Sequence, residues 1–166
     1  MSTRYYLWGE LVFPSSEALA AWEGAPVCVQ DYDWSDLFEG EVSSERVAVD
    51  EIFEPLEEVF SYDGQECYFV DLDCGLTRLV VRGYLHQDDL QRSLLAAFRC
   101  AAPLGASGTI HCQDALDPDY CLRLTIRDGS STLRALVPEE ALASSAIADE
   151  ILAEVFRRVA MHQAGD

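Results

Sequence analysis

The side chains best suited to chemistry are carboxylates mixed with aromatic rings between residues 31 and 41. These eleven residues include five acids, three aromatic residues and no base. Exposed carboxylates attract arginine and lysine, and they speed encounter with a surface that carries these residues. We therefore predict a surface that binds a basic protein partner. The predicted partner-binding residues are Asp31, Asp33, Trp34, Asp36, Phe38, Glu39 and Glu41, with Glu54, Glu57 and Glu58 on the helix expected to follow.

The aromatic rings of this stretch allow two interpretations. Trp34 and Phe38 can anchor the segment to the hydrophobic core, or they can face solvent until a partner covers them. The two interpretations are compatible, because one ring can anchor the segment while the carboxylates around it point outward.

Acidic residues are concentrated in the first half of the chain. The sequence has 30 acidic and 11 basic residues and a formal net charge of −19. Residues 1–75 contain 18 acids and two arginines, a net charge of −16, whereas residues 76–166 contain 12 acids and nine arginines, a net charge of −3. Such a field repels nucleic acids and anionic membranes and speeds encounter with a basic partner, so we expect neither nucleic acid nor membrane as a partner. Solubility alone would also account for an acidic composition.

Calcium and zinc sites are both disfavoured by the spacing of the ligand types. Asp31, Asp33 and Ser35 fit the first, third and fifth positions of a calcium loop, but Asp36 replaces the required glycine and Val42 the required glutamate. The six cysteines lack the short paired spacing of structural zinc sites. We therefore expect no metal.

Motifs for catalysis and for nucleotide cofactors are missing from the sequence. It contains no G-x-S-x-G, no Walker-type glycine loop and no G-x-G-x-x-G. No motif links a serine or cysteine to His86, His111 or His162, so we expect binding rather than catalysis and no cofactor. The arginines at 78, 82, 123, 127 and 134 are expected on polar sheet faces, paired across strands with acids.

The compartment follows from what precedes the first expected strand. The N-terminal residues lack a basic region followed by an apolar one, and no apolar run is long enough to span a membrane. We expect a cytoplasmic protein with reduced thiols. The chain also contains no lysine and no asparagine, whose codons are rich in A and T, and we expect a G+C-rich, bacterial genome.

Helices and strands follow from the spacing of apolar residues. Strands are expected at 4–13, 26–30, 67–73, 77–85, 120–127 and 132–137, and a further strand should begin at 109. Helices are expected at 16–23, 51–60 and 88–101, and a last helix should begin at Pro138 and break at 144–145. Residues 31–46 are expected to form an irregular loop. Tyr5, Leu7, Leu11 and Phe13 should share one side of the first strand.

This order of elements predicts an α+β fold. We expect one domain over residues 1–166, with a largely antiparallel sheet of about six to seven strands and about four helices packed on it. The acidic half (1–75) precedes a helix-plus-hairpin core (76–166). The helical connection between Leu85 and Thr109 could make one neighbouring pair of strands parallel.

In size, acidity and α+β pattern the chain resembles the immunity proteins of bacterial toxin systems. The resemblance implies a stoichiometric inhibitor that covers the basic active site of a toxin or effector encoded nearby. The alternative is a small ligand-binding or enzymatic α+β domain with its pocket between helix and sheet.

The first testable prediction concerns the cysteines. Because the chain shows neither a secretion signal nor paired cysteine spacing, titration of the denatured protein without reductant should find six free thiols, and elemental analysis should find no zinc. Fewer than about five thiols, or stoichiometric zinc, would contradict this expectation.

Overall fold

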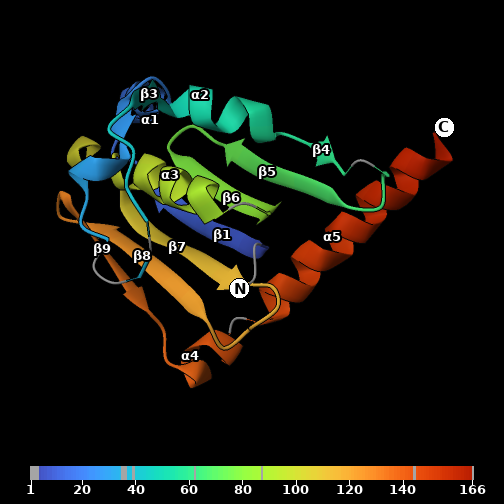
Figure 1. Cartoon of the computed structure of the whole chain (residues 1–166). Coiled ribbons are helices and arrows are strands. Elements are labelled where there is room, and N and C mark those ends of the chain that lie inside the picture. The colour runs from blue at the N-terminus through green and yellow to red at the C-terminus, as the bar shows by residue number, and fades with distance from the viewer. Residues whose placement is uncertain are drawn as a thin grey trace.

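The computed structural model of the chain describes residues 4–34, 37–38, 40–61, 63–86, 88–143 and 145–165. It contains a seven-stranded sheet, a two-stranded ribbon, and helices packed against both faces of the large sheet (Figure 1). The strands are β1 (Tyr5–Val12), β2 (Pro26–Cys28), β3 (Arg46–Ala48), β4 (Val59–Phe60), β5 (Cys67–Cys74), β6 (Arg78–Leu85), β7 (Ser107–Asp114), β8 (Cys121–Arg127) and β9 (Ser130–Ala135). The α-helices are α1 (Ser16–Glu23), α2 (Val49–Phe53), α3 (Asp88–Arg99), α4 (Pro138–Ala143) and α5 (Ser145–Ala164), with short 3-10 turns η1 (Val29–Asp31), η2 (Glu54–Leu56) and η3 (Ala102–Leu104).

Strand β1 lies at the centre of the large sheet. The strand order is β4-β5-β6-β1-β7-β8-β9, and every neighbouring pair is antiparallel. From Tyr5 to Val12, β1 pairs with β6 on one side and with β7 on the other. The predicted α+β fold, with a largely antiparallel sheet and helices packed on it, is confirmed.

The connection through α3 does not produce a parallel neighbouring pair, and that expectation is wrong. Strands β6 and β7 run in the same direction, but β1 lies between them and is antiparallel to both. The reason is that β1 pairs along both of its edges. The connection through α3 therefore crosses β1 and spans two strand spacings, about 10 Å, instead of one.

Alternation along β1 separates two hydrophobic cores. Tyr5, Leu7 and Leu11 belong to the core shared with α1, α2 and α3, as predicted. Tyr6 and Trp8 point to the opposite face and belong to the core shared with α4 and α5. In Figure 1, α3 lies across the front of the central strands. The sheet is therefore covered by different helices on its two faces.

The helix expected from Glu51 to Phe60 is much shorter than predicted. Helix α2 ends at Phe53, and a 3-10 turn and the short strand β4 take up the rest of the predicted span. Pro55 explains the end of α2, because proline has no N–H to donate and its ring collides with the preceding turn of an α-helix. The helix also begins earlier, after Ala48, so Asp50 lies within its first turn and does not cap it.

Two other boundaries differ from the predictions. The loop expected at 31–46 ends in β3, which pairs with β2 as a ribbon outside the large sheet. A three-residue strand is too short to show a period of its own. The expected break of the last helix separates α4, ending at Ala143, from α5, beginning at Ser145, and residue 144 lies outside the described residues.

Phe98 lies at the centre of the core beneath α3. Its side chain is 0% exposed, and its ring packs against Trp22 and Phe53, with ring centroids 6.1 and 5.3 Å away. The indole Nε1 of Trp22 donates a hydrogen bond to the carbonyl oxygen of Ala97 at 2.7 Å, which fixes α1 against α3. Three helices thus meet around one ring.

The second prediction follows from this packing. Phe98→Ala should lower the free energy of unfolding by about 3–5 kcal/mol, because it leaves a cavity among three helices. The matched surface change, Arg127→Ala on the exposed end of β8, should cost less than about 1 kcal/mol. Chemical denaturation of both variants measures the difference, and equal losses would contradict the central position of Phe98.

Candidate binding groove

The predicted acidic-aromatic segment is held against α3 by its aromatic rings. Trp34 is 7% exposed, and its indole Nε1 donates to the carbonyl oxygen of Val29 at 2.8 Å. The guanidinium of Arg99 lies over the rings of Tyr32 and Trp34, 5.2 and 5.1 Å from their centroids. It also donates to the carbonyl oxygen of Asp33 at 2.8 Å. A cation over two aromatic faces fixes the segment to the helix, so Trp34 is an inward anchor.

A second arginine of α3 holds the other end of the segment. Arg92 donates to the carbonyl oxygens of Gly40 and Glu41, at 3.4 and 3.3 Å, and its guanidinium lies 5.7 Å from the centre of the Phe38 ring. Phe38 is half-buried and packs edge-on against Trp34. The described acids of the segment, all exposed, are Asp31, Asp33 and Glu41, whereas Asp36 and Glu39 lie outside the described residues.

The other predicted acids line a groove on a different surface. The groove has a volume of about 1100 Å³ and lies between α1, α2 and η2 on one side and β5 and the end of α5 on the other. Seven carboxylates line it, from Glu23, Asp50, Glu54, Glu57, Glu58, Asp71 and Asp73. No described residue of the 31–41 segment is among the lining residues. The structure therefore divides the predicted patch into a loop surface and a groove.

The main cation of the groove is already paired within the protein. Arg158 on α5 lies 2.5 Å from Asp71, 3.5 Å from Glu58 and 2.8 Å from Glu154, measured between guanidinium nitrogens and carboxylate oxygens. Its guanidinium also lies 3.9 Å from the centre of the Phe69 ring, and its side chain is only 14% exposed. Arg158 thus ties α5 to the sheet and leaves little positive charge for a ligand.

The remaining charge of the groove is strongly negative. Arg157 pairs with Glu154, and hydrogen bonds from Arg157 and Arg158 lower the pKa of the Glu154 carboxyl to about 2. His162 stacks on the Phe60 ring with centroids 3.8 Å apart. Seven carboxylates and two arginines give the lining a formal charge of −5 with His162 neutral.

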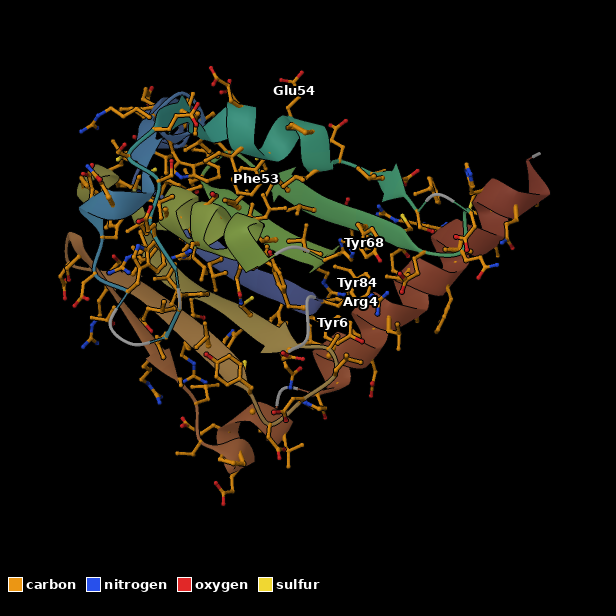
Figure 2. All side chains as sticks on the ribbon, in the orientation of Figure 1. Arg4, Tyr6, Phe53, Glu54, Tyr68 and Tyr84 are labelled. Carbon is orange, nitrogen blue, oxygen red and sulfur yellow. The ribbon has the colours of Figure 1, made fainter. Side chains whose placement is uncertain are left out.

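Apolar side chains form the deep part of the groove. Trp22, Val49, Phe53 and Val70 line it and are all buried. In Figure 2, Phe53 lies on the side of α2 toward the sheet, whereas Glu54 lies on the outer side of the same segment. An apolar floor beneath a carboxylate rim can bind ammonium or guanidinium groups together with apolar side chains between them.

Sequence reasoning identified part of this rim and missed the rest. Glu54, Glu57 and Glu58 were predicted from their nearness to the acidic segment. Glu23 comes from α1, Asp50 from α2, and Asp71 and Asp73 from β5, so only the tertiary fold brings these acids together. The alternation of Asp71 and Asp73 with apolar neighbours at the end of a strand was the available signal.

His111 is half-buried on the face of the sheet that carries Trp8. Its ring stacks on Trp8 with centroids 5.2 Å apart, and its Nε2 accepts a hydrogen bond from Arg123 at 3.0 Å. The proton of the neutral ring therefore lies on Nδ1, which is buried without a hydrogen-bond partner. Loss of solvation, and secondarily the charge of Arg123, lowers the pKa of His111 to about 4. The fold therefore favours the neutral ring of His111.

Four of the five predicted sheet arginines, those at 78, 82, 123 and 134, pair with acids, mainly on helices. Arg78 pairs across strands with Glu10 at 2.7 Å, as the sequence suggested. Arg82 instead contacts Glu150 of α5 at 3.0 Å. Arg123 and Arg134 both lie within 4 Å of Glu140 on α4, at 3.8 and 3.0 Å. These pairs fasten the C-terminal helices to the sheet.

All six cysteines are free, and five of them are buried. Burial raises the pKa of the Cys100 thiol to about 12, which makes it unreactive. Cys74 is the exposed one, and it lines the groove at the end of β5.

Among the residues that the structure describes, no three histidine, cysteine, aspartate or glutamate side chains converge to hold a metal ion. No described helix combines the length and apolar character of a membrane span.

Comparison of the chain with protein-family models, curated proteins and solved structures gave no match.

The third prediction uses the pKa of His111. Because its folded pKa of about 4 lies below the ordinary 6.5, the folded state disfavours the protonated ring. The stabilising contribution is complete above pH 6.5 and is lost as the pH falls toward 4. The free energy of unfolding should therefore decline over this range, with a slope below about 1.4 kcal/mol per pH unit.

His111→Phe retains a ring against Trp8 but cannot titrate, so its unfolding free energy should depend less on pH between about 6.5 and 5. Urea denaturation at a series of pH values provides the measurement. An identical pH dependence in the two proteins over this window would show that His111 is not held neutral by the fold.

Proposed function

We propose that this chain is an acidic binding protein of the immunity type, which neutralises a basic toxin or effector by covering its active site. The observation that carries the proposal is the groove of about 1100 Å³ whose rim holds seven carboxylates above an apolar floor. A basic segment of a partner would enter this groove.

Long-range attraction and short-range packing would have separate sources in such a complex. The net charge of −19 speeds encounter with a basic partner, and salt screens that attraction over about 10 Å. The more exposed apolar lining residues Phe60, Leu72 and Met161 supply apolar contact once the partner has docked. The exposed acids Asp31, Asp33 and Glu41 add to the field from the loop surface.

Exposed carboxylates are also suited to recognition on energetic grounds. Glu54, Glu57 and Asp73 are exposed in the free protein, so their contribution to folding stability is small. They can therefore be arranged for binding a partner's arginines and lysines without a large cost to the fold.

The same groove supports a second candidate, a ligand-binding domain for a small polyamine-like cation. The groove lies between α2 and the edge of the sheet, which is the pocket position of this alternative, and its volume is near the upper end of small-molecule sites, about 1000 Å³. A small cation would use the rim without needing the surface around it.

The fourth prediction tests the proposed function by titration calorimetry against the product of the adjacent gene. Binding should weaken between low and high salt, and Glu54→Arg/Glu57→Arg should reduce affinity at least about 100-fold, because it places two positive charges on the rim. Asp33→Arg/Asp36→Arg tests the loop surface in the same way. Asp117→Arg/Asp119→Arg, in the exposed turn before β8, is the control and should leave affinity nearly unchanged.

Thermal unfolding of each variant checks that the fold is intact. If the groove variant binds as tightly as the parent and the loop variant does not, the contact surface is the loop. If the neighbouring product does not bind and spermidine does, with the Glu54→Arg/Glu57→Arg change abolishing it, the small-cation candidate replaces the inhibitor.

A further inference from the structure

The floor of the groove includes a sheet edge that is largely unpaired. Strand β4 pairs with β5 at only two positions, Val59 with Tyr68 and Phe60 with Cys67. The inner edge of β5 pairs with β6 from Phe69 to Cys74. Over the same six residues, no described strand pairs with the outer edge.

The direction of the backbone groups on this edge follows from two hydrogen bonds. The N–H of Gly75 donates to the carbonyl oxygen of Arg78 at 2.8 Å, so Gly75 and alternate residues before it face β6. The N–H of Ser61 donates to the carbonyl oxygen of Glu66 at 2.9 Å, so the even-numbered residues of β5 face outward. Val70, Leu72 and Cys74 therefore direct their N–H and C=O groups away from the sheet.

The groove runs along this outward edge. All five residues from Val70 to Cys74 line it, and α1, α2 and η2 form the opposite wall. Figure 1 shows β5 extending past β4 beneath α2. The unpaired backbone groups of an edge strand are a template for another strand, and here they face a groove of about 1100 Å³.

We propose that an extended basic segment of a partner protein adds to β5 as a further strand of the sheet, within the acidic groove. This inference rests on the proposed binding of a basic partner and specifies how it binds. Val70 is buried, so main-chain hydrogen bonds to the more exposed Leu72 and Cys74 would supply affinity, and the side chains on either face would supply specificity.

Alternation predicts the sequence of that segment. Val70 and Leu72 belong to or pack against the core on the α2 side, whereas Asp71 and Asp73 point to the other face. Residues of the added strand next to Val70 and Leu72 would be apolar, and those next to Asp71 and Asp73 would be basic. The expected pattern is therefore an alternation of apolar residues with arginine or lysine.

Charge decides against a second copy of this chain as the occupant. Two β5 edges would place Asp71 and Asp73 of one copy beside the same acids of the other, and like charges on adjacent strands destabilise pairing. The groove with its formal charge of −5 adds to this repulsion. The same carboxylates that deter self-association attract a basic strand.

The fifth prediction uses a fluorescent eight-residue peptide of alternating arginine and valine as the probe. Two derivatives keep its charge. One is methylated at the backbone amide nitrogen of every valine, and the other at the backbone amide nitrogen of every arginine. Because only one edge of an added strand faces β5, one derivative should lose at least about tenfold in affinity relative to the other, from the loss of several hydrogen bonds. Fluorescence anisotropy measures all three.

The outcomes separate this inference from the function on which it rests. If both derivatives bind as the parent peptide does, or both weaken equally, strand addition is wrong and binding of a basic partner stands. If the parent peptide does not bind at all, both proposals fail.

A variant of the protein tests the edge directly. Leu72→Pro removes one outward N–H but no hydrogen bond to β6, and should weaken the parent peptide about tenfold. Ala135→Pro is the matched control, because Ala135 occupies an exposed outward position on β9 at the opposite edge of the sheet. Amide hydrogen exchange in the unsubstituted protein gives an independent measurement: the peptide should slow exchange at Leu72 and Cys74. Unchanged exchange at these two amides on saturation with peptide would overturn strand addition.

Discussion

The pairing of β1 on both sides is the constraint on which the rest of the structure depends. Once β6 and β7 occupy its two edges, every other strand of the sheet must lie farther out. Strands β5 and β4 therefore lie beyond β6, and β8 and β9 lie beyond β7. Close approach at the centre requires glycine: a Cβ at Gly9 or Gly108 would collide with the backbone of the facing strand. The free edge of β5, and hence the groove beside it, is a consequence of this arrangement.

Arginine provides all the side-chain cations of this chain other than histidine, because the sequence contains no lysine. At least eight of the eleven arginines form ion pairs with acids, and Arg99 and Arg92 use guanidinium contacts to hold the acidic-aromatic segment on α3. A planar guanidinium can bind several carbonyl and carboxylate oxygens while lying over a ring. Because these cations are used internally, the acids of the groove are left in excess.

Local patterns predicted the elements that carry a full period. The alternation of Tyr5, Leu7 and Leu11 placed β1 correctly, and the serine and glycine around α1 marked both of its ends. The short strands β3 and β4 were missed, because two or three residues carry no period and their pairing depends on distant partners. The same limit applies to the groove: the acids on η2 and just after it are neighbours in sequence, but those on β5 and α1 join them only through the fold.

The central position of β1 has a consequence for synthesis of the chain on the ribosome. Strand β1 pairs with residues 78–85 and 107–114, so it stays without its first sheet partner until β6 has been translated and without its second until β7 follows. Contacts between residues so far apart in sequence make folding slow, and an unpaired apolar strand is prone to aggregate while it waits. High negative charge in the first 75 residues would keep such nascent chains apart, because they repel one another before any of them can fold.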